Sequence, residues 1–145
     1  MDRRELLGVL SAGAAGLVAL GGGSARGAHE GHDHDEHLKI MGECIKVCNE
    51  AAHHCLGEAV KGGSHADHHA KSHEATIDCQ AFCSLAAALM ARSSPMAKYA
   101  HQACADACRD CAAACEGQEA EIMKECVKAC RDCEKVCRQM VGSPS

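Results

Sequence analysis

The sequence has almost no aromatic residues, with one Phe, one Tyr and no Trp among 145 residues. Aromatic side chains usually supply much of the volume of a protein core. Hydrophobic residues nevertheless make up 47% of the chain. Alanine, leucine and cysteine must therefore fill the core, and the length is enough for one small domain.

The chain also lacks a cationic surface. Its 15 Lys and Arg residues and 20 Asp and Glu residues give a formal net charge of −5, with both signs mixed along the sequence. Domains that bind nucleic acid carry clustered basic residues, so we expect no nucleic-acid partner. Scattered Lys and Glu are typical of solvent-exposed helix faces.

Cysteine, in contrast, is abundant, with 13 residues. A disulfide-stabilised secreted domain normally has an even number of cysteines separated by loop-rich sequence. Here the number is odd and the sequence between the cysteines has a helical pattern. A disulfide scaffold therefore describes this chain poorly.

Residues 1–27 have the pattern of an export signal. Arg3 and Arg4 precede the apolar stretch Leu6–Leu20, which is followed by small residues. This stretch spans about 15 residues, fewer than the roughly 20 that cross a bilayer, so we expect cleavage and no stable membrane insertion afterwards. The paired arginines resemble a twin-arginine signal, which exports proteins that have already folded.

A tract of alternating histidines and carboxylates follows in residues 28–37. It has no apolar periodicity, so we predict a flexible N-terminus. Imidazoles and carboxylates suit Cu(II) and Zn(II), but a solvated tail needs no such role, and the sequence leaves both interpretations open.

Residues 38–142 contain four helical segments separated by turn residues. Pro95 suits a first helical position behind Ser94 as a cap, and Gly117 suits a left-handed helix stop. Short connections make successive helices antiparallel neighbours. The predicted fold is all-α, an antiparallel up-down-up-down four-helix bundle. The expected helices are Leu38–Lys61, Ala66–Arg92, Pro95–Glu116 and Gln118–Val141.

The cysteines recur at intervals of three and four residues, which places them on one face of each helix. The third and fourth segments share the spacing C-x3-C-x2-C-x3-C and the sequence Ala-Cys-Arg-Asp-Cys. Ala51 and Ala86 stand where the pattern of the first two segments would place further cysteines. The bundle core is therefore predicted to be lined by Cys44, Cys48, Cys55, Cys79, Cys83, Cys104, Cys108, Cys111, Cys115, Cys126, Cys130, Cys133 and Cys137.

This arrangement of thiols favours Cu(I) over other soft metals. Thiolates select Cu(I), zinc or iron–sulfur clusters. Zinc needs a closed set of four ligands, usually from paired short knuckles, and iron–sulfur sites use loop runs ending in proline that are absent here. Two sulfurs from Cys-x3-Cys on a helix suit Cu(I), and each Cu⁺ that displaces a thiol proton cancels the thiolate charge. We predict multiple Cu(I) ions per chain.

Buried free cysteine also packs as a small apolar residue. That explanation suffices for one cysteine, but it does not account for 13 cysteines on one continuous seam.

The two ends of the predicted bundle differ in composition. Met41, Met90, Met96, Met140 and His101 fall at one end, here called the methionine end. Thioethers are soft neutral donors, so Met41, Met90, Met96 and His101 are candidate ligands where copper enters, although methionine also simply fills the ends of cores. The opposite end, here called the histidine end, carries His53, His54, His65, His68, His69 and His73. We expect most of them to be surface residues, and the sequence leaves a metal-binding role open.

The duplicated cysteine runs, the number of cysteines and the signal resemble the bacterial four-helix-bundle copper storage proteins, specifically the exported, twin-arginine-signalled kind of methane-oxidising bacteria. The resemblance covers the chain after the signal. It implies a non-enzymatic store that folds in the cytoplasm, binds Cu(I) on the core cysteines and is exported to the periplasm or to a compartment associated with intracytoplasmic membranes. It also implies a homotetramer and delivery to a copper enzyme such as particulate methane monooxygenase.

Other functions fit the residues less well. An oxidoreductase built on Cys108-x2-Cys111 or Cys130-x2-Cys133 would need an exposed, acidified thiol and a βαβ context. A copper chaperone would need only one or two exposed sites. Soft-metal detoxification differs from storage mainly in what releases the metal, and the sequence does not separate the two.

Overall fold

The computed structural model describes residues 26–142, and side chains from residue 33 onward. The predicted export signal thus lies almost entirely outside the described residues. Residues 26–142 contain four helices and no strand, which confirms the all-α prediction. The helices are α1 (Arg26–Lys61), α2 (Ala66–Ala91), α3 (Ala97–Cys115) and α4 (Glu121–Gly142).

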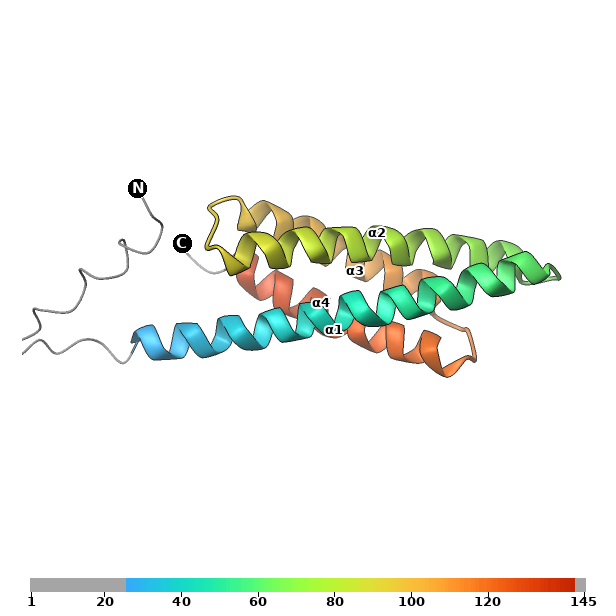
Figure 1. The fold of residues 1–145 in the computed structure, drawn as a ribbon, viewed down its shortest axis with the longest axis horizontal. Helices are drawn as coiled ribbons and strands as arrows, with labels where there is room; N and C mark the ends of the chain where they lie inside the picture. The colour runs from blue at the N-terminus through green and yellow to red at the C-terminus, as the bar shows by residue number, and fades with distance from the viewer. Residues whose placement is uncertain (1–25, 143–145) are drawn as a thin grey trace, which may run out of the picture.

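The four helices form an antiparallel bundle (Figure 1). Helix α1 packs against α2 and α4, and α3 packs against the same two helices, so each helix has two neighbours around a common axis. The connections α1–α2 and α3–α4 lie at one end of the bundle, and the connection α2–α3 lies at the other, beside the end of α4. The predicted up-down-up-down topology is confirmed.

Glycines with positive φ end two of the helices. Gly62 and Gly63, with φ of 76° and 103°, follow α1, and Gly117, with φ of 80°, follows α3. This left-handed region costs other residues energy because of the Cβ atom. The predicted helix stop at Gly117 is therefore confirmed, and it lets α4 turn back directly along α3.

The start of α1 differs from the prediction. The helix begins at Arg26, so residues 28–37, predicted to be flexible, are helical. This tract contains no proline or turn pair that would stop a helix, so the helix continues outward from the packed region. In Figure 1 this part of α1 projects beyond the rest of the bundle.

The start of α3 also differs. The prediction placed Pro95 at the first helical position with Ser94 as cap, but the helix begins at Ala97. Ser94 still organises the turn, since its hydroxyl accepts a hydrogen bond from the Met96 N–H at 3.3 Å and its carbonyl accepts one from the Ala97 N–H at 3.0 Å. The end of α1 at Lys61 and the start of α2 at Ala66 are as predicted, and the remaining helix bounds differ from the prediction by one to three residues.

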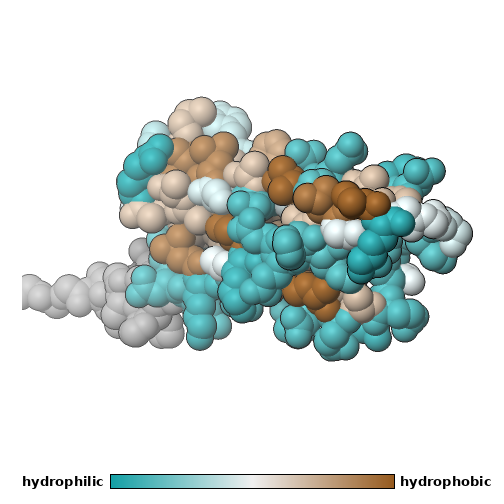
Figure 2. Space-filling model, turned by 45° about the vertical axis from the view of Figure 1, so that its right-hand side comes forward, coloured by the Kyte–Doolittle hydropathy of each residue, from teal (hydrophilic) through white to brown (hydrophobic). Residues whose placement is uncertain are grey.

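The bundle core consists mainly of cysteine, alanine and methionine, with little leucine or valine. Ala51 and Ala86 are fully buried at the positions where they interrupt the cysteine pattern. Several larger apolar side chains lie outside, among them Ile77, Phe82 and Leu85 on α2, and Figure 2 shows apolar patches on the surface among the polar residues. Among the described residues, no helix is long and apolar enough to span a membrane.

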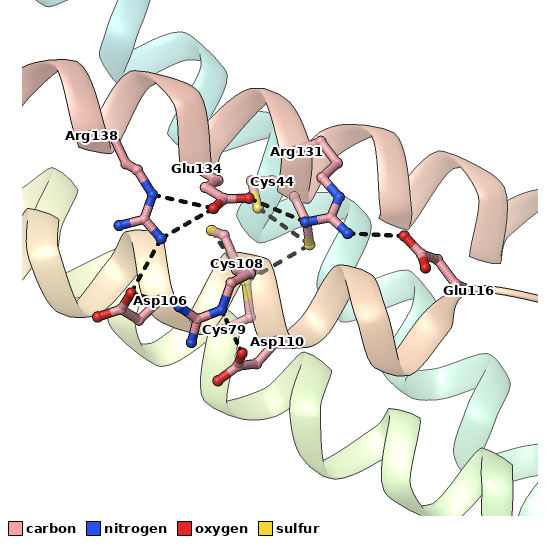
Figure 3. A network of polar contacts seen from close by, with 11 residues as sticks. Cys44, Cys79, Asp106, Cys108, Asp110, Glu116, Arg131, Glu134 and Arg138 are labelled. Atoms are coloured by element: carbon pink, nitrogen blue, oxygen red, sulfur yellow. Dashed lines mark hydrogen bonds and ion pairs between the residues drawn. The ribbon is translucent and has the colours of Figure 1, made fainter.

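Ion pairs on the outside connect α3 with α4. Arg138 bonds Asp106 of α3 at 3.2 Å and Glu134 of its own helix at 3.1 Å, while Arg131 bonds Glu116 at 2.9 Å. Figure 3 shows these charged side chains near the cysteines of the core. Exposed ion pairs contribute little to stability, so the fold depends mainly on the packed core.

Candidate metal centre

All 13 cysteines are buried and none forms a disulfide. Each has a relative exposure of 0 or 1%. Because the four helices each direct one face to the bundle axis, the helical spacing of three and four residues brings every thiol to the same interior. The predicted cysteine-lined core is confirmed.

The sulfurs form a continuous network rather than isolated pairs. Cys83 Sγ lies 3.3 Å from Cys104 Sγ, 3.6 Å from Cys108 Sγ, 3.7 Å from Cys133 Sγ and 3.8 Å from Cys44 Sγ. These neighbours come from all three other helices. Cys83 therefore joins thiols that the sequence separates widely.

Cys130 is a second junction. Its Sγ lies 3.7 Å from Cys48 Sγ, 3.9 Å from Cys79 Sγ and 4.0 Å from Cys44 Sγ. Cys79 Sγ in turn lies 3.6 Å from Cys108 Sγ. The close-up in Figure 3 includes Cys44, Cys79 and Cys108 among its connected side chains.

Four groups of cysteines place their sulfurs within 4.8 Å of one another. Neighbouring groups share members. In the order given below, Cys48 and Cys130 both belong to the second and third groups, Cys44 belongs to the first and second, and Cys133 belongs to the first and fourth. The groups are Cys44, Cys83, Cys108 and Cys133; Cys44, Cys48, Cys79 and Cys130; Cys48, Cys111, Cys126 and Cys130; and Cys104, Cys133 and Cys137.

These spacings suit soft metal ions held by shared thiolates. A metal–sulfur bond of about 2.3 Å places the sulfurs of a three- or four-coordinate ion about 4 Å apart, as in the groups described above. Distance alone does not separate zinc from Cu(I). Sharing of sulfurs favours Cu(I), because structural zinc sites usually take closed sets of four ligands, whereas Cu(I) needs only two or three donors and leaves each sulfur able to bridge neighbouring ions.

The histidine end of the core has a different donor set. Cys55 Sγ lies 3.6 Å from Met123 Sδ, and Cys115 Sγ lies 4.0 Å from Cys126 Sγ. Met123 is fully buried, and it is not among the ligands predicted from the sequence. Its position three residues before Cys126, on the same helix face, was the signal that could have identified it.

At the methionine end, Met41, Met90 and His101 are buried, with exposures of 0, 3 and 1%. Met96 lies outside, 55% exposed, in the turn before α3. Both ring nitrogens of His101 lack hydrogen-bond partners among the described residues. Burial lowers the pKa of His101, so the ring is a neutral donor placed beside the thiols.

The core has no built-in cation to balance thiolates. The buried polar residues in the described part of the chain are Ser72, Thr76 and His101, with no Lys or Arg. Burial raises the pKa of Cys55 to about 12, because a thiolate is poorly solvated there. A thiolate at Cys55 therefore depends on the charge of a bound cation.

A family model of copper storage proteins (Csp) matches residues 30–142. The chain belongs to this family. Members of the family store copper, so the protein is not an enzyme. Burial agrees, since Cys108, Cys111, Cys130 and Cys133 have no exposed thiol for a catalytic dithiol.

The solved structures that are similar to the chain include the following two. The Cu(I)-bound copper storage protein BsCsp3 is 26% identical with a TM-score of 0.65, covering 76% of this chain and 99% of its own. A protein from Nitrosospira multiformis is 32% identical with a TM-score of 0.51, covering 74% of this chain and 96% of its own. No curated protein matches the chain.

Proposed function

We propose that this member of the family stores many Cu(I) ions per chain on its 13 core cysteines. The observation that carries the proposal is the sharing of cysteines between adjacent sulfur groups, because shared thiolates allow ions to be stacked along the bundle. The Cu(I)-bound state of the similar protein BsCsp3 supports the choice of ion.

Charge neutrality supports a large capacity. Each Cu⁺ that binds releases a thiol proton, so the interior gains no net charge as it fills. If each thiolate bridges two ions and each ion takes two thiolates, the capacity is on the order of one Cu(I) per cysteine. A store filled in this way differs from a chaperone, which needs a single accessible site.

An anaerobic titration of the reduced chain with Cu(I), against a chromophoric chelator, tests the proposal. We expect tight binding that continues toward the number of cysteines. Saturation after one or two ions would leave most thiols as packing residues and favour the copper chaperone. Release of bound copper only on protein degradation would favour soft-metal detoxification.

Copper enters, in our proposal, through the methionine end. Met41, Met90 and His101 lie buried beside the thiols, and exposed Met96 lies at the same end. A thioether or neutral imidazole binds Cu(I) without losing a proton, so these side chains are suited to take an ion and pass it to the cysteines. The two unpartnered ring nitrogens of His101 support this role.

We further propose that residues 1–27 form a twin-arginine signal, that the store is of the exported methanotroph type, and that it resides in the periplasm or a compartment associated with intracytoplasmic membranes. Folding before export keeps the thiols buried when the chain meets oxidants. Cell fractionation tests this: the chain with Arg3 and Arg4 both replaced by Lys is expected to remain in the cytoplasm, whereas the parent protein is exported.

The proposed assembly is a homotetramer that supplies a copper enzyme such as particulate methane monooxygenase. The exposed apolar residues Ile77, Phe82 and Leu85 on α2 support an oligomer, since they are 40–50% exposed in one chain. Light scattering on the parent and on a Phe82→Glu variant tests the assembly. Copper transfer from the loaded protein to the apo-enzyme tests the recipient.

A further inference from the structure

A pocket of about 430 Å³ lies at the histidine end, outside the cysteine core. The end of α1, the start of α2 and the α3–α4 connection border it, and four of its lining residues are His54, Glu58, His65 and His69. The cysteine store uses none of these side chains. Their donor types, imidazole and carboxylate, are those that borderline divalent cations prefer.

The four residues form two pairs in helical register. His54 and Glu58 are four residues apart on α1. His65 immediately precedes α2, and its carbonyl accepts a hydrogen bond from the N–H of His69 in the first turn at 3.0 Å. Residues four apart lie on the same helix face. Because α1 and α2 are packed neighbours, the two pairs face one pocket.

The two central rings already have a spacing that suits a shared ion. The His54 and His69 ring centroids are 5.8 Å apart with an angle of 78° between the ring planes. Two imidazoles bound to one ion through bonds of about 2.0 Å have centroids about 5 to 6 Å apart. The four donor atoms do not form a group within 4.8 Å, so binding requires rotation of these side chains.

Hydrogen bonding separates these histidines from their neighbours. His68 Nε2 bonds the Ala114 carbonyl at 3.1 Å and His73 Nδ1 bonds the Ala52 carbonyl at 2.9 Å, so both rings already connect helices. Among the described residues, His54 and His65 make no hydrogen bond through their rings, and His69 Nδ1 is buried without a partner. These three rings are available as ligands.

The protonation states suit a cation as well. A hydrogen bond from Lys61 at 2.6 Å lowers the pKa of Glu58, which is therefore an anion at neutral pH. Burial lowers the pKa of His69, which favours the neutral ring that a metal needs. The Lys61–Glu58 ion pair is exposed and therefore weak, so a divalent cation can replace it.

We propose that His54, His65, His69 and Glu58 form a second metal site that binds one borderline divalent cation, with Zn²⁺ as its model. The site holds its ion independently of the Cu(I) store and fastens the end of α1 to the start of α2. It thus adds a second class of metal to a protein whose core is selective for soft ions.

Zinc titration of the Cu(I)-saturated chain tests the site, because copper occupies the thiols that would otherwise bind Zn²⁺. Every protein carries His29, His32, His34 and His37 replaced by Gln, which removes the other histidine-rich segment. We expect one Zn²⁺ per chain with micromolar or tighter affinity by calorimetry. Histidine-ring NMR of the same protein is expected to show shifts at His54, His65 and His69.

Single variants then assign the ligands. His54→Ala and His69→Ala are expected to weaken zinc binding at least about tenfold, and His53→Ala, which alters an exposed neighbour, is the matched control with unchanged affinity. Circular dichroism and copper capacity confirm folding, and Glu58→Gln replaces any variant that fails to fold. The absence of zinc binding, equal affinity in His54→Ala and the parent, or ring shifts confined to other histidines would refute the site.

Discussion

Replacing Cys130 by alanine is expected to remove more copper than replacing Cys55. Cys130 belongs to two of the sulfur groups and lies within 4.0 Å of three other thiols. Cys55 belongs to none of the groups, and its sulfur contact is Met123 Sδ at 3.6 Å. If thiolates bridge ions, the first change removes a donor from two sites at once.

The expected magnitudes follow from this difference. Cys130→Ala is predicted to lower the capacity by about two Cu(I) ions and Cys55→Ala by one at most. Both changes delete one fully buried sulfur, which costs the apo-protein about 1 kcal/mol of unfolding free energy in each case. Cys55→Ala is therefore a matched control for loss of packing.

Anaerobic titration against a chromophoric Cu(I) chelator measures the capacity, and thermal unfolding of each apo-protein measures the stability. Equal capacity losses in the two variants, or an unchanged capacity in Cys130→Ala, would refute bridging by shared thiolates. A loss of copper capacity in Cys130→Ala that is proportional to a loss of helicity would also contradict bridging, because partial unfolding would then explain it.

Three further results are expected. The apo-protein loses stability above pH 9, because the pKa of Cys55 is raised from 9.0 to about 12 in the fold. The contribution of Cys55 to the free energy of unfolding is complete below pH 9 and falls by up to about 4 kcal/mol as the pH approaches 12. Alkaline unfolding followed by circular dichroism checks this, and resistance of the apo-protein at pH 12 would contradict it. Replacing both Met41 and His101 by Leu is expected to slow copper uptake about tenfold in stopped-flow measurements while changing the capacity little, and unchanged uptake would count against the methionine end. Gly117→Ala is expected to cost about 1 kcal/mol in denaturant unfolding because φ is 80° there, although no atom lies within 4 Å of the added Cβ. A neutral effect would show that the turn relaxes.

Periodicity made the bundle and its core predictable from the sequence. Cysteines at intervals of three and four can share one buried face only on a helix, and Gly117 marks a turn because its backbone needs positive φ. The helix starts were less predictable. The histidine-rich tract 28–37 looked flexible because it has no apolar pattern, yet nothing in it ends a helix, and α1 continues through it.

The grouping of the thiols depended on the packing of four helices. Spacing places Cys83 on the core face, but only the register between helices brings Cys104 Sγ to within 3.3 Å of its sulfur. Met123 was missed because a single methionine on the helix face that carries the cysteines is typical of a residue that only fills the core. Its 3.6 Å contact with Cys55 depends on the alignment of α1 with α4. The pairing of His54 with His69 likewise depends on the neighbouring positions of α1 and α2.

The most direct test of the central claim is a crystal structure of the Cu(I)-loaded chain with anomalous diffraction collected at the copper edge. We expect copper peaks stacked along the bundle axis, each within about 2.3 Å of two or three sulfurs, with Cys44, Cys48, Cys130 and Cys133 each bound to more than one ion. Copper confined to one surface site, with the core thiols unbound, would refute storage of Cu(I) on shared core thiolates.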